Sequence, residues 1–140
     1  MKLLIITYGT EGDTRPLAAL GHALMQAGHQ VELLGDSSTL GVAQTLGIPA
    51  RAVAGDIRAT IAADGAMRDI TRNLARLTIA HSGDWLGQAI EAGQGCDAII
   101  VSGLAALVGL SAAEALRVPA IGAMLIPISP TAAFASPFLP

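Results

Sequence analysis

The stretch "YGTEGDTRP", residues 8–16, gathers chemically active side chains between an apolar run and a helical pattern. Glu11 and Asp13 carry carboxylates close to the start of that helix, and Arg15 follows them. The positive end of a helix dipole keeps such a carboxylate ionised, so that it can accept a proton. The same residues also allow a purely structural interpretation, in which Asp13 caps the helix and Arg15 neutralises it.

The glycines of this stretch do not complete a nucleotide-binding motif. A dinucleotide fingerprint needs three glycines in the order G-x-G-x-x-G, whereas only Gly9 and Gly12 precede the helix. A phosphate loop needs a lysine followed by Ser or Thr, and no lysine follows here. Asp36, after a second apolar run, is placed to contact a ribose, but capping of the next helix is the better explanation.

A regular alternation of strands and helices must position these residues. Short apolar runs predict strands at residues 2–7, 30–34, 50–54, 98–101 and 120–125, and helical spacing predicts helices from Pro16 to residue 27, over 36–47, over 67–92 and over 104–117. This order predicts an α/β fold with a Rossmann-like, doubly wound parallel sheet. Ligands bind such a sheet beyond the carboxyl ends of its strands, where the strand order reverses. Residues 8–16 occupy that position, and Ser102 follows the fourth strand across from them.

Composition narrows the setting. The chain has 140 residues, of which 52% are hydrophobic and 14% charged, so residues 1–140 should form a single domain with a large core. A net charge of −3 without a basic cluster makes nucleic acid an unlikely partner. The lone cysteine, Cys96, excludes an internal disulfide, and no secretory signal is present. We therefore expect a soluble, cytoplasmic protein.

Three stretches, in order, resemble landmarks of one enzyme family. "GTEGDTRP" at residues 9–16 is similar to the opening motif G-T-x-G-D-x-x-P of the GT-B glycosyltransferases, in the branch that contains the antibiotic, macrolide and sterol enzymes. "LGIPARAVAGD" at residues 46–56 resembles the second landmark, and residues 96–140 resemble the third. The resemblance covers nearly the whole chain, which looks like the truncated amino-terminal half of such an enzyme.

The resemblance implies a role for each matching residue. The amino-terminal domain of these enzymes binds the acceptor, and Asp13 matches their general base, which takes the proton of an acceptor hydroxyl during an inverting sugar transfer. Gly9, Thr10 and Gly12 would lie near the donor phosphates. A related branch has a histidine in this loop, and its absence here fits the antibiotic and sterol branch. No cofactor or metal is implied.

The residues that we expect to bind the acceptor are His81, Trp85, Ser102, Phe134 and Phe138. The resemblance implies this for the segment with His81 and Trp85, the position across from Asp13 favours Ser102, and Phe134 and Phe138 belong to an apolar terminal segment that an acceptor pocket would share. The implied partner is a small hydrophobic acceptor, a natural product or a sterol-like lipid. Each assignment has a structural alternative. His81 and Trp85 continue the apolar stripe of a helix, and a hydrogen-bonded core residue, or an exposed one if the helix ends near Gly83, is the better explanation of His81. A simple turn explains Ser102 about as well as a place at the cleft.

The length of the chain leaves two functions open. A donor nucleotide-sugar domain is absent from these 140 residues, so a nucleotide sugar should bind only when a donor domain is supplied in cis or in trans, and the chain alone should be inactive. The alternative is a non-catalytic binding or scaffold module that keeps the fold. We also expect a homodimer or larger homo-oligomer, with Phe134, Pro137 and Phe138 at or near the contact.

Overall fold

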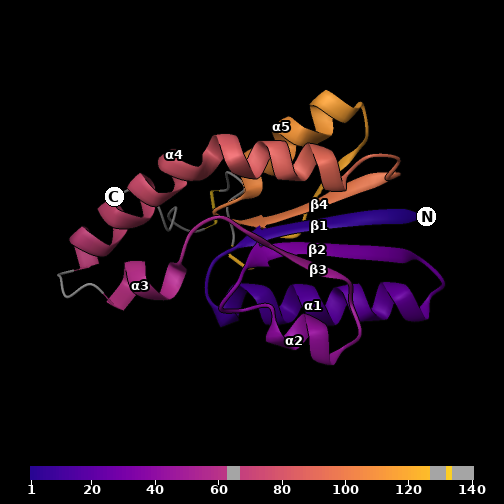
Figure 1. Ribbon diagram of the computed structural model, residues 1–140, viewed down its shortest axis with the longest axis horizontal. Coiled ribbons are helices and arrows are strands. Elements are labelled where there is room, and N and C mark those ends of the chain that lie inside the picture. The colour runs from indigo at the N-terminus through magenta and orange to yellow at the C-terminus, as the bar shows by residue number, and fades with distance from the viewer. Residues whose placement is uncertain (63–66, 127–131, 134–140) are drawn as a thin grey trace.

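The structure is a computed structural model, and it describes residues 1–62, 67–126 and 132–133. Strands and helices alternate along almost the whole chain (Figure 1). In order, the elements are β1 (Lys2–Tyr8), α1 (Glu11–Gln26), β2 (Gln30–Asp36), α2 (Gly41–Thr45), β3 (Ala50–Val53), α3 (Ile57–Ala62), α4 (Met67–Ala92), β4 (Ala98–Gly103), α5 (Ala106–Leu116) and β5 (Ala120–Gly122).

The five strands form one parallel sheet in the order β3-β2-β1-β4-β5, which confirms the predicted fold class. The central strand β1 pairs with β2 on one side and with β4 on the other. Leu4, Ile5 and Ile6 of β1 are fully buried. Because helices cover both faces of this strand, its apolar residues do not alternate with polar ones.

Helices cover the two faces of the sheet in separate layers. Figure 1 shows α1 and α2 on one face and α4 and α5 on the other. The first core contains Leu17 and Ala18 of α1, and the second contains Trp85 and Ala89 of α4. Gly109 brings α5 close to the sheet, since a Cβ there would lie only 2.6 Å from Cγ2 of Ile6.

The first helix begins earlier than its proline indicates. We predicted a start at Pro16, but α1 begins at Glu11, and Pro16 lies inside it. Thr10 is the N-cap residue, and its backbone N–H donates a hydrogen bond to Asp13 Oδ2 at 2.8 Å. This contact stabilises the first turn of the helix, so Asp13 is part of α1 and does not lie in the loop before it.

Two more helices differ from the sequence prediction. Residues 37–40 form a turn, and α2 starts only at Gly41, so the predicted helix start at Asp36 is wrong. Helix α3 was not predicted, although Asp56 caps it by accepting the N–H of Ala59 at 2.9 Å. By contrast, α4 continues through Gly83 to Ala92, as its apolar spacing indicated.

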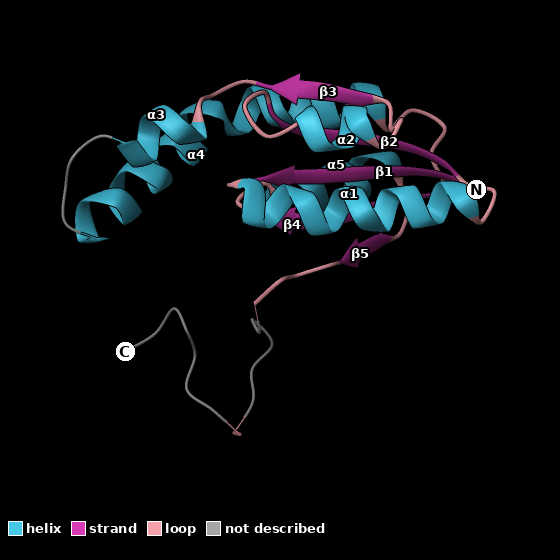
Figure 2. Cartoon of the chain, turned by 90° about the horizontal axis from the view of Figure 1, so that it is seen from below, coloured by secondary structure: helices cyan, strands magenta, loops and turns pink. Residues whose placement is uncertain are grey.

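Strand β5 lies at one edge of the sheet, opposite the edge formed by β3 (Figure 2). It has three residues where the sequence predicted six, and all three are exposed. In the described part of the chain, β5 pairs with β4 only. Phe134, Pro137 and Phe138 lie outside the described residues, so the contacts proposed for them stay predictions.

Candidate functional site

The strand order of the sheet reverses between β1 and β4, and the ends of these two strands are held tightly together. Tyr8 and Gly103 are Cα partners, and the N–H of Leu104 donates to the carbonyl of Tyr8 at 2.9 Å. Gly103 has a φ of 61°, and a Cβ there would lie 2.5 Å from the Tyr8 carbonyl oxygen. Only glycine fits this close approach without strain.

A cavity of about 540 Å³ opens at this junction. Its size is in the range of small-molecule sites, and most of its lining is apolar. The wall is formed by the end of β1, the start of α1, helices α3 and α4, the segment from β4 into α5, and the residues after β5. The lining residues are Tyr8, Gly9, Thr10, Asp13, Ile57, Ile61, Leu74, Ser102, Gly103, Leu104, Ala106, Leu107, Met124, Leu125 and Ile126.

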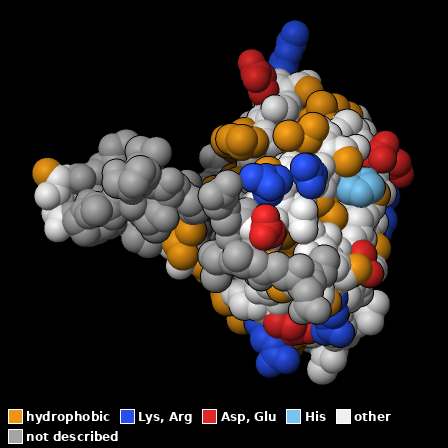
Figure 3. Space-filling view, turned by 90° about the vertical axis from the view of Figure 1, so that its left-hand side faces the viewer, with side chains coloured by type: hydrophobic (Ala, Val, Ile, Leu, Met, Phe, Trp, Pro, Cys, Tyr) orange, Lys and Arg blue, Asp and Glu red, His pale blue; other side chains and the backbone are white. Residues whose placement is uncertain are grey.

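The side of the molecule that faces left in Figure 1 is drawn in space-filling form in Figure 3. Hydrophobic side chains are interspersed there with charged ones, and Lys and Arg lie beside Asp and Glu instead of forming a separate patch. The described surface in this view therefore carries apolar side chains together with charges of both signs.

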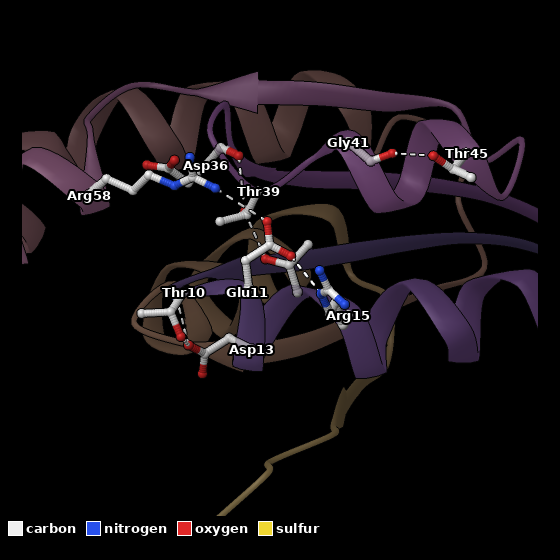
Figure 4. Close-up of polar contacts among 10 residues, drawn as sticks. Thr10, Glu11, Asp13, Arg15, Asp36, Thr39, Gly41, Thr45 and Arg58 are labelled. Carbon is white, nitrogen blue, oxygen red and sulfur yellow. Dashed lines mark hydrogen bonds and ion pairs between the residues drawn. The ribbon is translucent and has the colours of Figure 1, made fainter.

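Asp13 combines a structural contact with a place in the cavity wall. Its Oδ2 accepts hydrogen bonds from the backbone N–H of Thr10 at 2.8 Å and from Thr10 Oγ1 at 3.1 Å. The other carboxylate oxygen points away from Thr10 (Figure 4). Gly9 makes room for the carboxyl group, because a Cβ there would lie 2.5 Å from Cγ of Asp13. The helix cap that we considered as an alternative is thus present, and it uses one oxygen of the carboxylate.

Arg15 is not the ion-pair partner of Asp13. Its Nε donates to Glu11 Oε2 at 2.8 Å, and Arg58 of α3 approaches the other oxygen of Glu11 at 3.4 Å (Figure 4). Both arginine side chains are largely exposed. Glu11 therefore links α1 to α3 beside the cavity, and the carboxylate of Asp13 is left without an ion pair among the described residues.

Asp36 is a buried carboxylate behind the cavity wall. Its Oδ2 accepts the N–H of Ile57 at 2.9 Å, and its Oδ1 accepts the N–H of Ser38 at 2.8 Å. Burial raises its pKa, but the hydrogen bonds from Ser38 and Ile57 outweigh burial and lower the pKa below the usual value. Burial, followed by the proximity of the Asp36 carboxylate, raises the pKa of Tyr8. Asp36 thus connects β2 to the start of α3.

The two aromatic residues predicted on α4 lie beside the cavity wall and are not among the residues that line the cavity. Trp85 is fully buried, and its Nε1 donates to the carbonyl of Ala54 at 2.6 Å. Its ring contacts Tyr8 at a centroid distance of 4.3 Å and stacks with His81 at 6.3 Å. Trp85 therefore packs against Tyr8, which lines the cavity. Direct contact of His81 or Trp85 with an acceptor stays a prediction.

The other predicted site residues divide into two groups. Gly9, Thr10, Asp13 and Ser102 line the cavity, whereas Phe134 and Phe138 lie outside the described residues. Gly12 is exposed in the first turn of α1. The sequence analysis missed Ile57 and Ile61, since it did not predict α3. Their spacing of four residues directly after Asp56, a typical N-cap residue, was a signal for that helix.

No group of three or more His, Cys, Asp or Glu side chains in the described residues is arranged to hold a metal ion. No helix in the same residues is both long and apolar enough to cross a membrane.

The geometry and topology define one class of fold, the Rossmann-like half of a GT-B glycosyltransferase. The solved structure of the glycosyltransferase SsfS6 from Streptomyces sp. SF2575, complexed with thymidine diphosphate, superimposes with a TM-score of 0.66 and 24% sequence identity. The match covers 89% of this chain and 38% of that protein. No protein-family model matches the chain.

Sequence comparison gives the same family. A sterol 3-beta-glucosyltransferase from Eremothecium gossypii is 32% identical over 139 residues, which are 96% of this chain and 11% of that protein. An O-mycaminosyltylonolide 6-deoxyallosyltransferase from Streptomyces fradiae is 28% identical over 109 residues, which are 71% of this chain and 26% of that protein. The chain is thus similar in sequence, over most of its length, to one part of sterol and macrolide glycosyltransferases. It spans only about a tenth to a quarter of the length of these two relatives.

Proposed function

We propose that this chain is the acceptor-binding domain of an inverting glycosyltransferase whose acceptor is a small hydrophobic molecule with a hydroxyl group. One observation carries the proposal: Asp13, in the first turn of α1, lines a mostly apolar cavity of about 540 Å³ at the point where the strand order reverses. An apolar cavity of this size suits a sterol-like or polyketide-like molecule. Among the described residues that line the cavity, Asp13 has the one carboxylate, and a carboxylate can accept a proton from a hydroxyl group.

In the proposed reaction, the acceptor O–H donates its proton to the carboxylate of Asp13 while the acceptor oxygen attacks the anomeric carbon of the sugar. The bond from that carbon to the phosphate oxygen breaks, and the nucleoside diphosphate leaves with the electron pair. Attack from the face opposite the leaving group inverts the anomeric centre. Removal of the proton as the bond forms accelerates such a step by typically 10²- to 10⁴-fold.

The donor would approach from the same edge of the sheet. Gly9 and Thr10 join β1 to α1, and Gly12 lies in the first turn of α1. Small residues there let a phosphate approach the backbone. These three residues make up only one wall of a donor site, so we propose that a second domain, in cis or in trans, supplies the rest. The chain by itself should then bind uridine and thymidine diphosphate sugars too weakly to measure in a calorimetric titration.

The experiment that tests this function is an assay of sugar transfer. We would fuse the chain to the donor-binding part of SsfS6, supply a thymidine diphosphate sugar, and screen hydroxylated steroids and macrolide aglycones. The expected result is a glycoside with inverted anomeric configuration, and none from the unfused chain. Micromolar binding of a nucleotide sugar to the unfused chain would contradict the need for a second domain. Acceptor binding without transfer in any fusion would favour a non-catalytic binding module.

We also propose that the chain self-associates through the edge at β5. All three residues of β5 are exposed, and Ile121 is 49% exposed. An unpaired strand edge with apolar side chains favours pairing with a second chain. Light scattering over a range of concentrations tests this, and the variant Ile121→Lys should shift the population toward monomer. A monomer at every concentration in the unmodified chain would contradict it.

A further inference from the structure

The cavity contains a hydroxyl group that the described protein does not use. Ser102, near the end of β4, is 1% exposed and is one of the residues that line the cavity. Its Oγ has no hydrogen-bond partner among the described residues. A buried polar group without a partner costs about 1–3 kcal/mol. A ligand atom that forms a hydrogen bond with Ser102 therefore contributes more to the free energy of binding than the same hydrogen bond to an exposed serine would.

The position of Ser102 in the sheet places its hydroxyl at the Asp13 side of the cavity. Side chains alternate along a strand, and Ile100, two residues earlier on β4, belongs to the core under α1. Ser102 therefore faces α1 as well. Its Cα partner on β1 is Thr7, two residues before Gly9, against which Asp13 packs. Ser102 and Asp13 therefore border the same end of the cavity, where one ligand group can lie between them.

The remainder of the cavity has a different character. Ile57 and Ile61 of α3, Leu74 of α4 and Leu107 of α5 supply apolar side chains to its wall. A polar group of a ligand placed there would lose its hydrogen bonds to water without replacement. The cavity is thus polar at the end near β1 and β4 and apolar along the helices.

We propose that Ser102 determines acceptor specificity by donating a hydrogen bond to the oxygen of a hydroxyl group at the end of an otherwise apolar molecule. This inference rests on the proposed function and deepens it. The acceptor enters with its hydroxyl group toward β4, and its apolar body lies along α3 and α4. With Ser102 holding the oxygen, the O–H of the acceptor points to the carboxylate of Asp13. The ligand class is therefore an apolar molecule with a hydroxyl group at one end.

The test compares the binding of two probes that differ in one group, androstanol and its parent hydrocarbon androstane, by equilibrium dialysis with the 140-residue chain. We expect the alcohol to bind about tenfold more tightly, because the hydrocarbon leaves the Ser102 hydroxyl unpaired. In Ser102→Ala this preference should fall to within about twofold, mainly through weaker binding of the alcohol.

Thr7→Val is the matched control. Thr7 is fully buried, lies next to Ser102 in the sheet and also has an unpaired hydroxyl, but it does not line the cavity. It should keep the full preference for the alcohol, and circular dichroism would verify that both variants fold. Equal binding of the two probes to the unmodified chain, no binding of either, or an unchanged preference in Ser102→Ala would overturn the inference.

The outcome is separable from that of the transfer assay. If the fusion transfers sugar but Ser102→Ala keeps the preference for the alcohol, this inference fails and the proposed function stands. If the preference depends on Ser102 but no fusion transfers sugar to any alcohol, the specificity contact stands and the catalytic function fails.

Discussion

Two polar regions border the same cavity, and the protein uses them differently. At the first turn of α1, Asp13 accepts two hydrogen bonds from Thr10, so its carboxylate already has a structural role. At the end of β4, the Ser102 hydroxyl has no partner in the described residues. A side chain with a local structural contact, such as Asp13, can therefore still take part in catalysis. A buried polar side chain without a hydrogen-bond partner is the better indicator of where a ligand binds.

The largest expected effect separates the two roles of Asp13. Asp13→Asn keeps an oxygen that can accept the Thr10 N–H, but the amide cannot take up a proton. In the fusion enzyme we expect turnover to fall by roughly 10²- to 10⁴-fold, with little change in melting temperature. Steady-state kinetics and thermal melts measure both quantities.

Asp13→Ala provides the comparison for this variant, since it also removes the cap and should lower the stability by about 1 kcal/mol. Activity of Asp13→Asn within a few-fold of the unmodified enzyme would mean that Asp13 is a helix cap only.

A second effect concerns Gly9, which leaves room for the carboxyl group of Asp13. The added Cβ of Gly9→Ala would collide with the carboxyl group of Asp13, so we expect the carboxylate to move by about 1 Å and turnover to fall by about 10²-fold. Gly12→Ala is the steric control for folding, because its Cβ would lie 3.5 Å from Thr10 Oγ1, an ordinary contact. That control should melt at the same or a higher temperature, since alanine favours the helix.

The kinetics of these two variants then distinguish their roles. Undiminished turnover in Gly9→Ala would show that the position of Asp13 does not matter. A raised KM for the donor in Gly12→Ala would support the predicted proximity of this residue to the donor phosphates.

The fold itself was largely predictable from the sequence, and the boundaries of the site were not. Apolar runs without alternation identified the buried strands, and the alternation of strands with helices indicated a parallel sheet with helices on both faces. Helix α1 starts before Pro16, since the side chain of Asp13 caps it, a contact that proline statistics do not reveal. Helix α3 is only six residues long, too short for its periodicity to stand out, so two cavity residues, Ile57 and Ile61, were missed.

The two predicted aromatic residues show a different limit. Periodicity placed His81 and Trp85 on the buried side of α4, as observed, but it does not tell whether a buried ring faces a cavity or another ring. Trp85 packs against Tyr8, and Tyr8 lines the cavity. That distinction depends on three-dimensional packing between β1 and α4.

A third prediction contrasts Asp36, whose polar atoms are paired, with Ser102. Asp36→Asn should lower the stability at pH 7 by about 2 kcal/mol, because hydrogen bonds to a buried charge are lost or weakened. The folded-state pKa of Asp36 lies below its usual value, so its stabilisation is complete above about pH 4 and is lost as the pH falls through the lowered folded value.

Urea denaturation at a series of pH values measures this contribution. Asp36→Asn should reduce the loss of stability below pH 4. If the free energy of unfolding falls equally steeply with decreasing pH in Asp36→Asn and in the unmodified chain, Asp36 does not contribute to the acid sensitivity.

The smallest expected effect is on the stability of the Ser102 variant. Ser102→Ala removes a buried hydroxyl that forms no hydrogen bond in the described structure, so the free energy of unfolding should stay within about 0.5 kcal/mol or rise. Urea denaturation of this variant beside Ser111→Ala, an exposed serine on α5, provides the measurement. A loss of more than 1 kcal/mol in Ser102→Ala alone would show that the protein does use this hydroxyl.

The most direct test of the account is a crystal structure of the chain with androstanol bound. We expect the steroid rings against Ile57, Ile61 and Leu74, with the hydroxyl oxygen within about 2.6–3.2 Å of a carboxylate oxygen of Asp13. A steroid bound outside the cavity, or bound within it with its hydroxyl group at the opposite end from Asp13, would contradict the assignment of this domain as the acceptor site.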